Sequence, residues 1–411
     1  MTEAWIIDAC RTPRGIGKAG KGALSSMHPQ HLGAAVLKAI AERNKINTAE
    51  VDDIIWGTSS QRGTQGGDLG RMAALDAGYD VKSSAVTLDR FCGSGITSVN
   101  IAASSIMSGM EDLVLAGGTE MMSTYGQDGN TPSPFMDNGN TRLRSEHPQP
   151  HQGVCADAIA TLEGINREAV DALAFVSQQN ADKAIKAGYF DKSLIPVYNA
   201  EGELVLDKEE FPRPQTTLEG LSDLKASFES LADYPLDEEG TTFRKLVLQK
   251  YPDLKINHVH HAGNSSGVVD GAAALLLASP NYAKANGMKP RARIRAMANM
   301  GDSPTLMLNA PVPAAKKVLE KANLSINDID LFEVNEAFSV VTEKFIRDLD
   351  IDRAKINVNG GAMALGHPIG ATGSILVGTV LDELERRDLQ FGLVTMCAAG
   401  GMAPAVIIER V

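Results

Sequence analysis

The chain has 411 residues, of which 22% are charged and 43% apolar, and a formal net charge of −12 at pH 7. This length predicts two or three domains or one large composite, and the composition is typical of a folded globular protein. The negative charge disfavours nucleic acids and anionic membranes as partners. The longest apolar run, 271–278, is too short to span a membrane, and no secretory signal pattern is evident, so we expect a cytoplasmic enzyme.

Strands and helices alternate along the first part of the chain. Apolar segments bounded by turn residues predict strands at 4–9, 53–57, 84–88 and 112–117. Segments with apolar residues every three to four positions predict helices around 31–43, 68–77 and 94–109. This order predicts an α/β fold of βαβ-type units, in which helices cover a sheet.

The same order of elements returns near the carboxyl end. The segment around Asp52 resembles the segment around Asp330, at an offset of 278 residues. Gly95, at the start of a predicted helix, has the same offset from Gly373, which precedes another. Two landmarks that share one offset favour a duplicated βαβ domain over the general rhythm of α/β proteins.

A region of different composition, 123–258, separates the two halves. It is rich in Asn, Gln, Asp and Pro and contains a predicted helix at 166–188. A long segment of this kind predicts an inserted domain or lid. Within it, 228–255 is strongly charged with scattered aromatic residues, which favours a pair of solvated surface helices; a substrate or partner contact is the alternative.

One cysteine stands out by its position. The four cysteines are widely spaced, which disfavours disulfides and a zinc ribbon: Cys10, Cys92, Cys155 and Cys397. Cys92 directly precedes a predicted helix, whose free N–H groups and positive dipole end predict a thiol pKa below the usual value of about 8.5. Gly93 and Gly95 would let a substrate carbonyl approach the backbone. The alternative is a small buried apolar side chain.

Three polar residues of the second half are candidate partners. The duplication places His367, in a glycine-rich turn, at the counterpart of the Cys92 turn, and a Cys/His pair is typical of an activated thiol nucleophile. Cys397 ends an apolar strand in the same half and could move a proton. Asn335 also ends a strand, where it could hold a water or donate to an oxyanion. Each residue could instead be structural, as a turn former or cap.

Five motifs together resemble those of the thiolases, coenzyme A dependent acyltransferases that make or cleave 3-ketoacyl-CoA. They are CGSG, AGNSSGVVDGAAA, VNEAF, GGAMALGHPIGATG and a terminal C-x-x-G-G, in the family's order. The resemblance implies a five-layer αβαβα fold, assembled as a homodimer or homotetramer. It implies one half from 1–122 with 259–283, a second half from 284–411, and a loop domain from 123–258 that covers coenzyme A and substrate.

The resemblance also implies a role for each candidate. Cys92 would be the nucleophile that carries the acyl group, and His367 the base that activates it. Cys397 would be the acid/base that protonates the departing enolate. Asn335 would hold a water that forms one oxyanion hole with His367, while the backbone N–H groups of Cys92 and Ala399 would form another.

For coenzyme A, the resemblance places His151 and Ser266 near the pantetheine arm and Arg213 near the nucleotide. Acyl-CoA and CoA would be substrates, and no permanently bound cofactor or metal is expected. Two positions depart from many family members, which have glycine where this chain has Ala399 and asparagine where it has Asp89. The segment 228–255 is also longer and more acidic than in short-chain members, which disfavours a preference for acetoacetyl-CoA.

Two other functions are weaker alternatives. A decarboxylating ketoacyl synthase of the same superfamily would not use a second cysteine, so Cys397 disfavours it. A non-catalytic acyl-CoA-binding protein on a thiolase scaffold would be expected to lack some of the four catalytic groups, and all are present. The cluster HVHH at 258–261 suggests a metal site, but no cysteine or carboxylate beside it completes a ligand set, which favours a structural turn.

Overall fold

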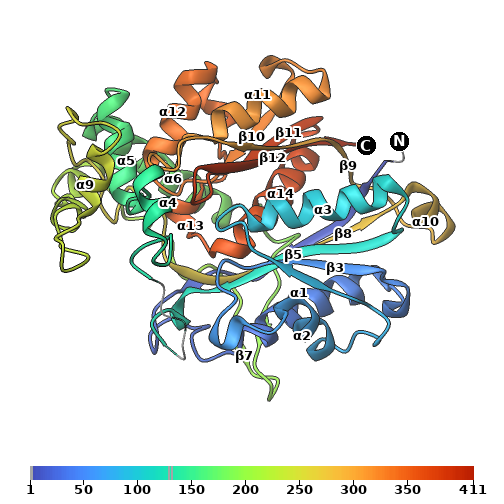
Figure 1. The fold of residues 1–411 in the computed structure, drawn as a ribbon. Coiled ribbons are helices and arrows are strands. Elements are labelled where there is room, and N and C mark those ends of the chain that lie inside the picture. Colours follow the sequence, from blue (N-terminus) through green and yellow to red (C-terminus); the bar gives the residue numbers. More distant parts are fainter. Residues whose placement is uncertain (1–2, 128–129, 131–132) are drawn as a thin grey trace.

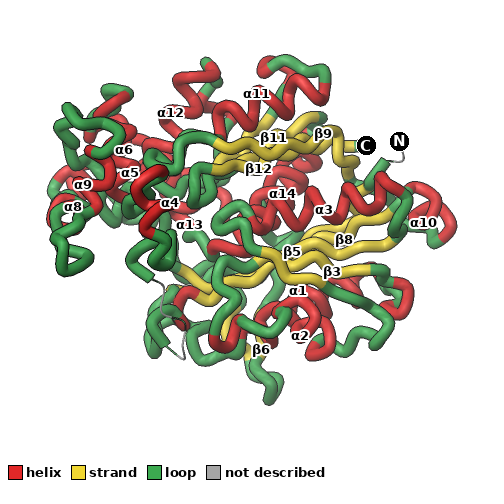
Figure 2. Tube along the Cα trace, viewed as in Figure 1, coloured by secondary structure: helices red, strands yellow, loops and turns green. Residues whose placement is uncertain are grey.

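The computed structural model describes residues 3–127, 130 and 133–411, and its strands form two bands with helices between and around them (Figure 1, Figure 2). In the first half the strands are β1 (Trp5–Arg11), β2 (Gly15–Ile16), β3 (Asp53–Gly57), β4 (Val86–Leu88), β5 (Leu113–Met121) and β8 (Val269–Ala278). In the second half they are β9 (Ala292–Gly301), β10 (Leu331–Val334), β11 (Phe391–Thr395) and β12 (Met402–Arg410).

The strands of both halves are hydrogen-bonded in one continuous order, β10-β11-β12-β9-β1-β8-β5-β3-β4, with β2 paired to β8. The halves join where β1 pairs with β9 over only two residue pairs, Trp5 with Arg293 and Ile6 with Ala292. Pairing is parallel among β3, β4 and β5 and between β10 and β11, as the predicted βαβ units require, and antiparallel elsewhere. The four strands predicted in the first half are confirmed as β1, β3, β4 and β5.

Helices form three layers around the two bands of strands (Figure 1). The pair α1 (Pro29–Asn44) and α2 (Leu69–Asp76) covers the outer face of the first band, and α11 (Pro311–Ala322) and α12 (Ser339–Leu349) cover the outer face of the second. Between the bands lie α3 (Ser94–Ser108) and α14 (Ile369–Arg387), which are buried along most of their length because each touches strands and its partner helix. The five layers are the predicted αβαβα architecture.

Sequence explains where α1 begins and which face it buries. His28 precedes the helix, its ring nitrogen accepts a hydrogen bond from the N–H of Gln30, and Pro29 occupies the first turn, where a missing N–H costs nothing. Leucine, valine and isoleucine recur every three to four residues, which gives one apolar stripe against the sheet: Leu32, Val36, Leu37 and Ile40.

The duplication appears as repeated hydrogen bonds. The Asp52 carboxylate accepts the N–H groups of Asp112 and Leu113 at 2.8 and 3.0 Å. The Asp330 carboxylate accepts those of Gln390 and Phe391 at 2.9 and 2.8 Å, so donors and acceptor share the same offset. In each half an aspartate before one parallel strand therefore fixes the start of its neighbour.

The central helices cross at the two glycines that mark the repeat. A Cβ atom on Gly95 would lie 2.7 Å from the backbone nitrogen of Ser374, and one on Gly373 would lie 2.1 Å from that of Ile96. Only glycine lets the backbones approach this closely. The crossing brings the amino-terminal ends of α3 and α14 together at the centre of the molecule.

The intervening region forms an outlying helical layer at one end of the molecule (Figure 1). The layer contains α4 (Thr141–Glu146), α5 (Gln152–Leu162), α6 (Arg167–Lys186), α7 (Leu218–Ser222), α8 (Glu229–Ala232) and α9 (Phe243–Leu248). The same region also forms a small sheet of β6 (Val197–Tyr198) and β7 (Leu204–Leu206), which lies apart from this layer and packs beside α1. Two further short helices, α10 (Pro280–Ala285) and α13 (Ala362–Leu365), lie in the halves. The described residues include no helix with the length and apolar character needed to cross a membrane.

Candidate active site

Cys92 lies in the turn that leads into α3 and lines a cavity of about 570 Å³. The preceding Phe91 has a φ of 48°, an unusual conformation for a bulky residue. Its N–H donates to the Asp89 carboxylate at 2.7 Å, which fixes the turn. Asp89 therefore makes an acceptor contact here that an asparagine oxygen could also make, and the turn presents the Cys92 thiol to the cavity.

The prediction of a low thiol pKa at Cys92 is wrong. Burial raises the pKa of Cys92 to about 12, and the negative charges of Glu120 and Asp89 add to the rise. Hydrogen bonds from the backbone N–H groups of Cys92 and Ala399 lower this pKa but do not overcome the rise. The helix end supplies donors, as expected, but burial outweighs them, and the carboxylate of Glu120 on β5 adds to the rise.

The two glycines near Cys92 make close contacts with the second half. A Cβ atom on Gly93 would lie 2.8 Å from the Pro404 ring, and Gly95 faces α14. Both glycines thus allow the second half to pack against the nucleophile turn, and the approach of a substrate carbonyl to this backbone stays a prediction.

His367 is buried in the turn before α14, and its ring is oriented by a neighbour on that helix. Its Nδ1 lies 2.6 Å from the hydroxyl oxygen of Thr372, which in turn donates to the carbonyl of Pro368 at 3.0 Å. Because the hydroxyl proton is used on Pro368, Thr372 accepts from Nδ1–H, and the lone pair of the neutral ring is on Nε2. Ile369, two residues along, lines the same cavity as Cys92.

The charge state of His367 suits a base. Burial, with a contribution from the positive charge of Arg14, lowers the pKa of His367 to about 3. Arg14 itself is within 3.5 Å of the Gly366 carbonyl and is paired with the buried Glu209 carboxylate. At neutral pH the site therefore combines a protonated thiol with a neutral imidazole.

Asn335 follows β10 and faces the reactive side of His367. Its Nδ2 lies 3.4 Å from His367 Nε2, at the long end of a hydrogen bond. Its Oδ1 is buried and accepts no hydrogen bond from any described residue. A buried acceptor of this kind is suited to a water molecule or ligand group that donates to it.

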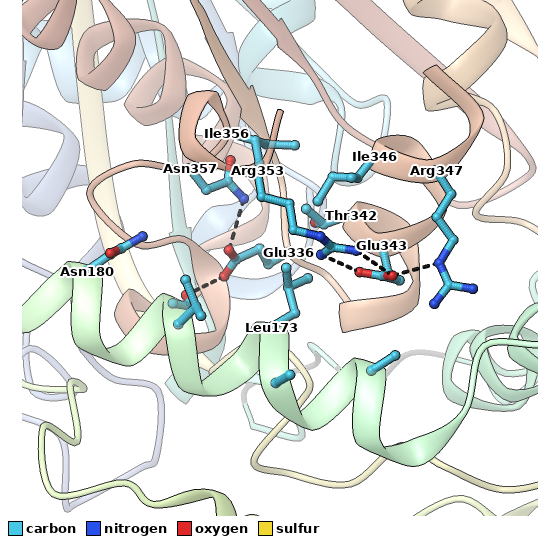
Figure 3. A pocket seen from close by; sticks show the side chains of 14 residues that line it. Leu173, Asn180, Glu336, Thr342, Glu343, Ile346, Arg347, Arg353, Ile356 and Asn357 are labelled. Atoms are coloured by element: carbon cyan, nitrogen blue, oxygen red, sulfur yellow. Dashed lines mark hydrogen bonds and ion pairs between the residues drawn. The ribbon is translucent and has the colours of Figure 1, made fainter. Parts of the chain in front are cut away.

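The neighbouring Glu336 fixes the Asn335 turn to the His367 turn, beside a pocket of about 340 Å³ (Figure 3). Its carboxylate accepts from the Ser177 hydroxyl at 2.6 Å, the Asn357 amide at 2.9 Å and the Met363 N–H at 3.1 Å. Figure 3 shows Glu336 between Asn357 and the pale green helix, α6. The buried carboxylate thereby joins three segments that surround the site.

Cys397 is buried in the turn after β11, and burial together with the charge of Cys92 raises its pKa. Ala399, two residues later, lines the cavity, and its backbone N–H acts to lower the pKa of Cys92. Positive φ values in this turn fall at Gly400 (79°) and Gly401 (77°) and not at Ala399. The alanine at this position is therefore accommodated without left-handed strain.

Comparisons with known proteins agree with this geometry. Models of the thiolase N-terminal and C-terminal domains match residues 4–232 and 288–410. A steroid 3-ketoacyl-CoA thiolase of Mycobacterium tuberculosis is 38% identical over 418 residues, which cover 100% of this chain and 95% of the relative. A β-ketoadipyl-CoA thiolase of Acinetobacter baylyi is 38% identical over 433 residues and covers both chains fully, at 100% each.

The chain belongs to the thiolase family. The crystal structure of human mitochondrial 3-ketoacyl-CoA thiolase matches with a TM-score of 0.84 and 32% identity, covering 100% of this chain and 99% of that one. The predicted family, the αβαβα fold and the assignment as an acyltransferase are thus confirmed.

Of the three residues expected to contact coenzyme A, one lies at the cavity of this thiolase. His151 lines the cavity and packs against Phe228 and Phe243, with ring centroids 5.7 and 5.5 Å away. Burial lowers the pKa of His151, and its Nδ1 accepts from the Gly153 N–H, so the neutral ring carries its proton on Nε2. It is a half-buried donor in a mostly apolar wall.

The other two residues lie elsewhere. Arg213 lines a separate pocket of about 240 Å³ with Gln178 and Thr217. Ser266 donates its N–H to the Ala337 carbonyl at 2.9 Å and lines neither pocket. Their predicted contacts with coenzyme A stay predictions.

The histidines of HVHH have protein partners. His258 and His260 contact the two carboxylate oxygens of Asp157 at 2.6 and 2.7 Å, and His261 contacts Asp171 at 2.8 Å. Two carboxylates on α5 and α6 thus anchor the segment that returns from the helical layer to the first half, in agreement with its interpretation as a structural turn.

Thr372, Arg14, Glu120 and Glu336 are the site residues that sequence reasoning missed. Thr372 and Glu336 belong to the motifs GGAMALGHPIGATG and VNEAF, so their closeness in sequence to His367 and Asn335 could have indicated that they lie at the site. Arg14 and Glu120 reach the site only through the fold: Glu120 accepts the N–H of Gly370, 250 residues away, at 2.8 Å.

Proposed function

We propose that this chain cleaves 3-ketoacyl-CoA by thiolysis, or runs the reverse condensation, through an acyl group carried on Cys92. The observation that carries this proposal is the cavity at the junction of the two halves, which is lined by Cys92, Ala399 and the turn that follows His367. Support also comes from the relatives, which are named as 3-ketoacyl-CoA and β-ketoadipyl-CoA thiolases.

In the first half of the proposed reaction, the Cys92 sulfur attacks the keto carbon while His367 Nε2 takes the thiol proton. The bond between the keto carbon and the α-carbon then breaks, and its electron pair stays on the α-carbon as the enolate of acetyl-CoA. Cys397 donates its proton to that carbon, and acetyl-CoA leaves. The products of this half are an acyl thioester on Cys92 and acetyl-CoA.

In the second half, the thiol of coenzyme A attacks the acyl group, its proton restores Cys397, and the proton on His367 returns to the Cys92 sulfur. The shortened acyl-CoA leaves, and the enzyme returns to its starting state. The high pKa of Cys92, about 12, makes a positioned base necessary for attack and makes the thiolate a poor resting state.

Two sets of donors would stabilise the oxyanions of these steps. The N–H groups of Cys92 and Ala399, which both lower the pKa of the Cys92 thiol, would serve the tetrahedral oxygen during acyl transfer. The protonated His367 and a water on Asn335 would serve the enolate oxygen. A single donor of this kind is worth roughly 3 kcal/mol in the transition state.

The other parts of the proposal concern coenzyme A and assembly. One half would comprise 1–122 and 259–283, and the other would comprise 284–411. Residues 123–258 would form the loop domain that covers coenzyme A, with His151 beside the pantetheine arm. The cytoplasmic location and the homodimer or homotetramer stay predictions.

Replacing Cys397 by alanine tests the division of labour. The Cys397→Ala variant should lose thiolysis by at least about 100-fold, because no acid protonates the enolate, yet still accept an acyl group on Cys92 from acyl-CoA. Cys155→Ala, which removes an equally buried thiol outside the site, should keep thiolysis. Full thiolysis by Cys397→Ala would contradict the proton-transfer role.

A further inference from the structure

The cavity at Cys92 is walled largely by apolar side chains from several separate parts of the chain. Within it, the segment 228–255 contributes the apolar atoms of Leu231, Tyr234, Leu236 and Phe243. This segment therefore contacts the space in front of the nucleophile, in line with the less favoured alternative for it, a substrate contact. Its two short helices are amphipathic, with the charged side chains outside.

No cation is available to a ligand in this wall. None of the described residues that line the cavity is Lys or Arg, and none occurs in the sequence from 123 to 141. Two arginines of the surrounding layer are already paired: Arg144 with Asp137 at 2.8 Å, and Arg244 with Asp233 at 2.7 Å. His151 is neutral, because burial lowers its pKa.

The charges near the nucleophile also disfavour a negatively charged acyl group. Glu120 and Asp89 both act on Cys92 as negative charges. A carboxylate at the far end of an acyl group would therefore enter a cavity with no Lys or Arg among its described lining residues. Burying an unpaired carboxylate is strongly unfavourable.

Sequence identity does not choose between the acyl groups named for the relatives. The steroid thiolase and the β-ketoadipyl thiolase are each 38% identical to this chain, and a β-ketoadipyl group ends in a carboxyl group. We propose that the acyl group accepted at Cys92 is uncharged and apolar, and that Leu231, Leu236 and Phe243 of the segment 228–255 select it. The inference rests on the proposed thiolysis and names its substrate class.

The test compares two esters of equal chain length on the wild-type enzyme: 3-ketooctanoyl-CoA and its ω-carboxylated analogue. The apolar ester should have a kcat/KM at least about 100-fold higher, because a carboxylate would be left without a partner. A ratio near one, or a preference for the carboxylated ester, would overturn the inference. If the enzyme cleaved none of the three compounds, the two esters and acetoacetyl-CoA, the proposed function itself would be overturned.

A charge placed in the wall should shift this ratio. Leu231→Lys should lower the ratio of kcat/KM for the apolar ester to kcat/KM for the carboxylated ester by at least about tenfold, since the ammonium group can pair with the ω-carboxylate. Leu162→Lys is the matched control, because Leu162 ends α5 at the surface and does not line the cavity. An unchanged ratio in a folded Leu231→Lys variant would overturn the assignment of this segment as the selecting wall.

Discussion

Thr372 acts on the reaction only through His367, whose Nδ1–H it accepts at 2.6 Å. Thr372→Val should leave the ring free to rotate and to adopt the other tautomer, so kcat should fall about 10- to 100-fold with KM nearly unchanged. Thr379→Val is the matched control, because Thr379 on the same helix bonds only the Ile375 carbonyl. Equal kcat values in the two variants would contradict the positioning role.

The protonation states of Cys92 and His367 make a second prediction for single residues. With a Cys92 pKa of about 12, the thiolate fraction rises tenfold for each pH unit throughout the neutral and mildly alkaline range. The rate of Cys92 alkylation by iodoacetamide, measured from pH 6 to pH 9, should therefore rise with a slope near one and no plateau. A plateau below pH 8 would indicate the depressed pKa that the helix end alone predicts.

At the scale of elements, the crossing of α3 and α14 depends on a backbone contact. Gly373→Ala should lower the free energy of unfolding by about 3 kcal/mol, because the added carbon would lie 2.1 Å from the Ile96 nitrogen. Gly378→Ala on the same helix meets only the Ala9 Cβ at 3.3 Å and should stay within about 1 kcal/mol. Denaturant unfolding of both variants measures this difference, and similar costs would contradict the crossing.

Elements also show where sequence patterns suffice. The strand at 53–57 and the helix at 166–188 were predictable because each has its own periodicity and turn residues, and they appear as β3 and α6. The segment 228–255 was predicted as a solvated helix pair because its charges dominate its composition. Its few inward apolar residues, such as Leu236, take their role from the neighbouring cavity, which no local pattern records.

At the scale of the whole molecule, the duplication explains how two distant turns form one site. The repeat could be predicted because each half keeps an aspartate, Asp52 or Asp330, whose carboxylate accepts backbone N–H groups at the start of the neighbouring strand. The repeat also suggested that the turns of Cys92 and His367 meet. It could not predict the charge state of the thiol, since the burial that raises the thiol pKa arises only in the folded molecule and Glu120, which adds to the rise, belongs to neither turn.

The account depends most directly on an acyl group being carried by Cys92. Brief exposure of the wild-type protein to acetyl-CoA, followed by peptide mass spectrometry, should place one acetyl group on the Cys92 peptide, and added coenzyme A should remove it. Cys397 should stay unmodified under the same conditions. Turnover of a 3-ketoacyl-CoA with no adduct on Cys92, or with the acetyl group on another residue, would contradict the account.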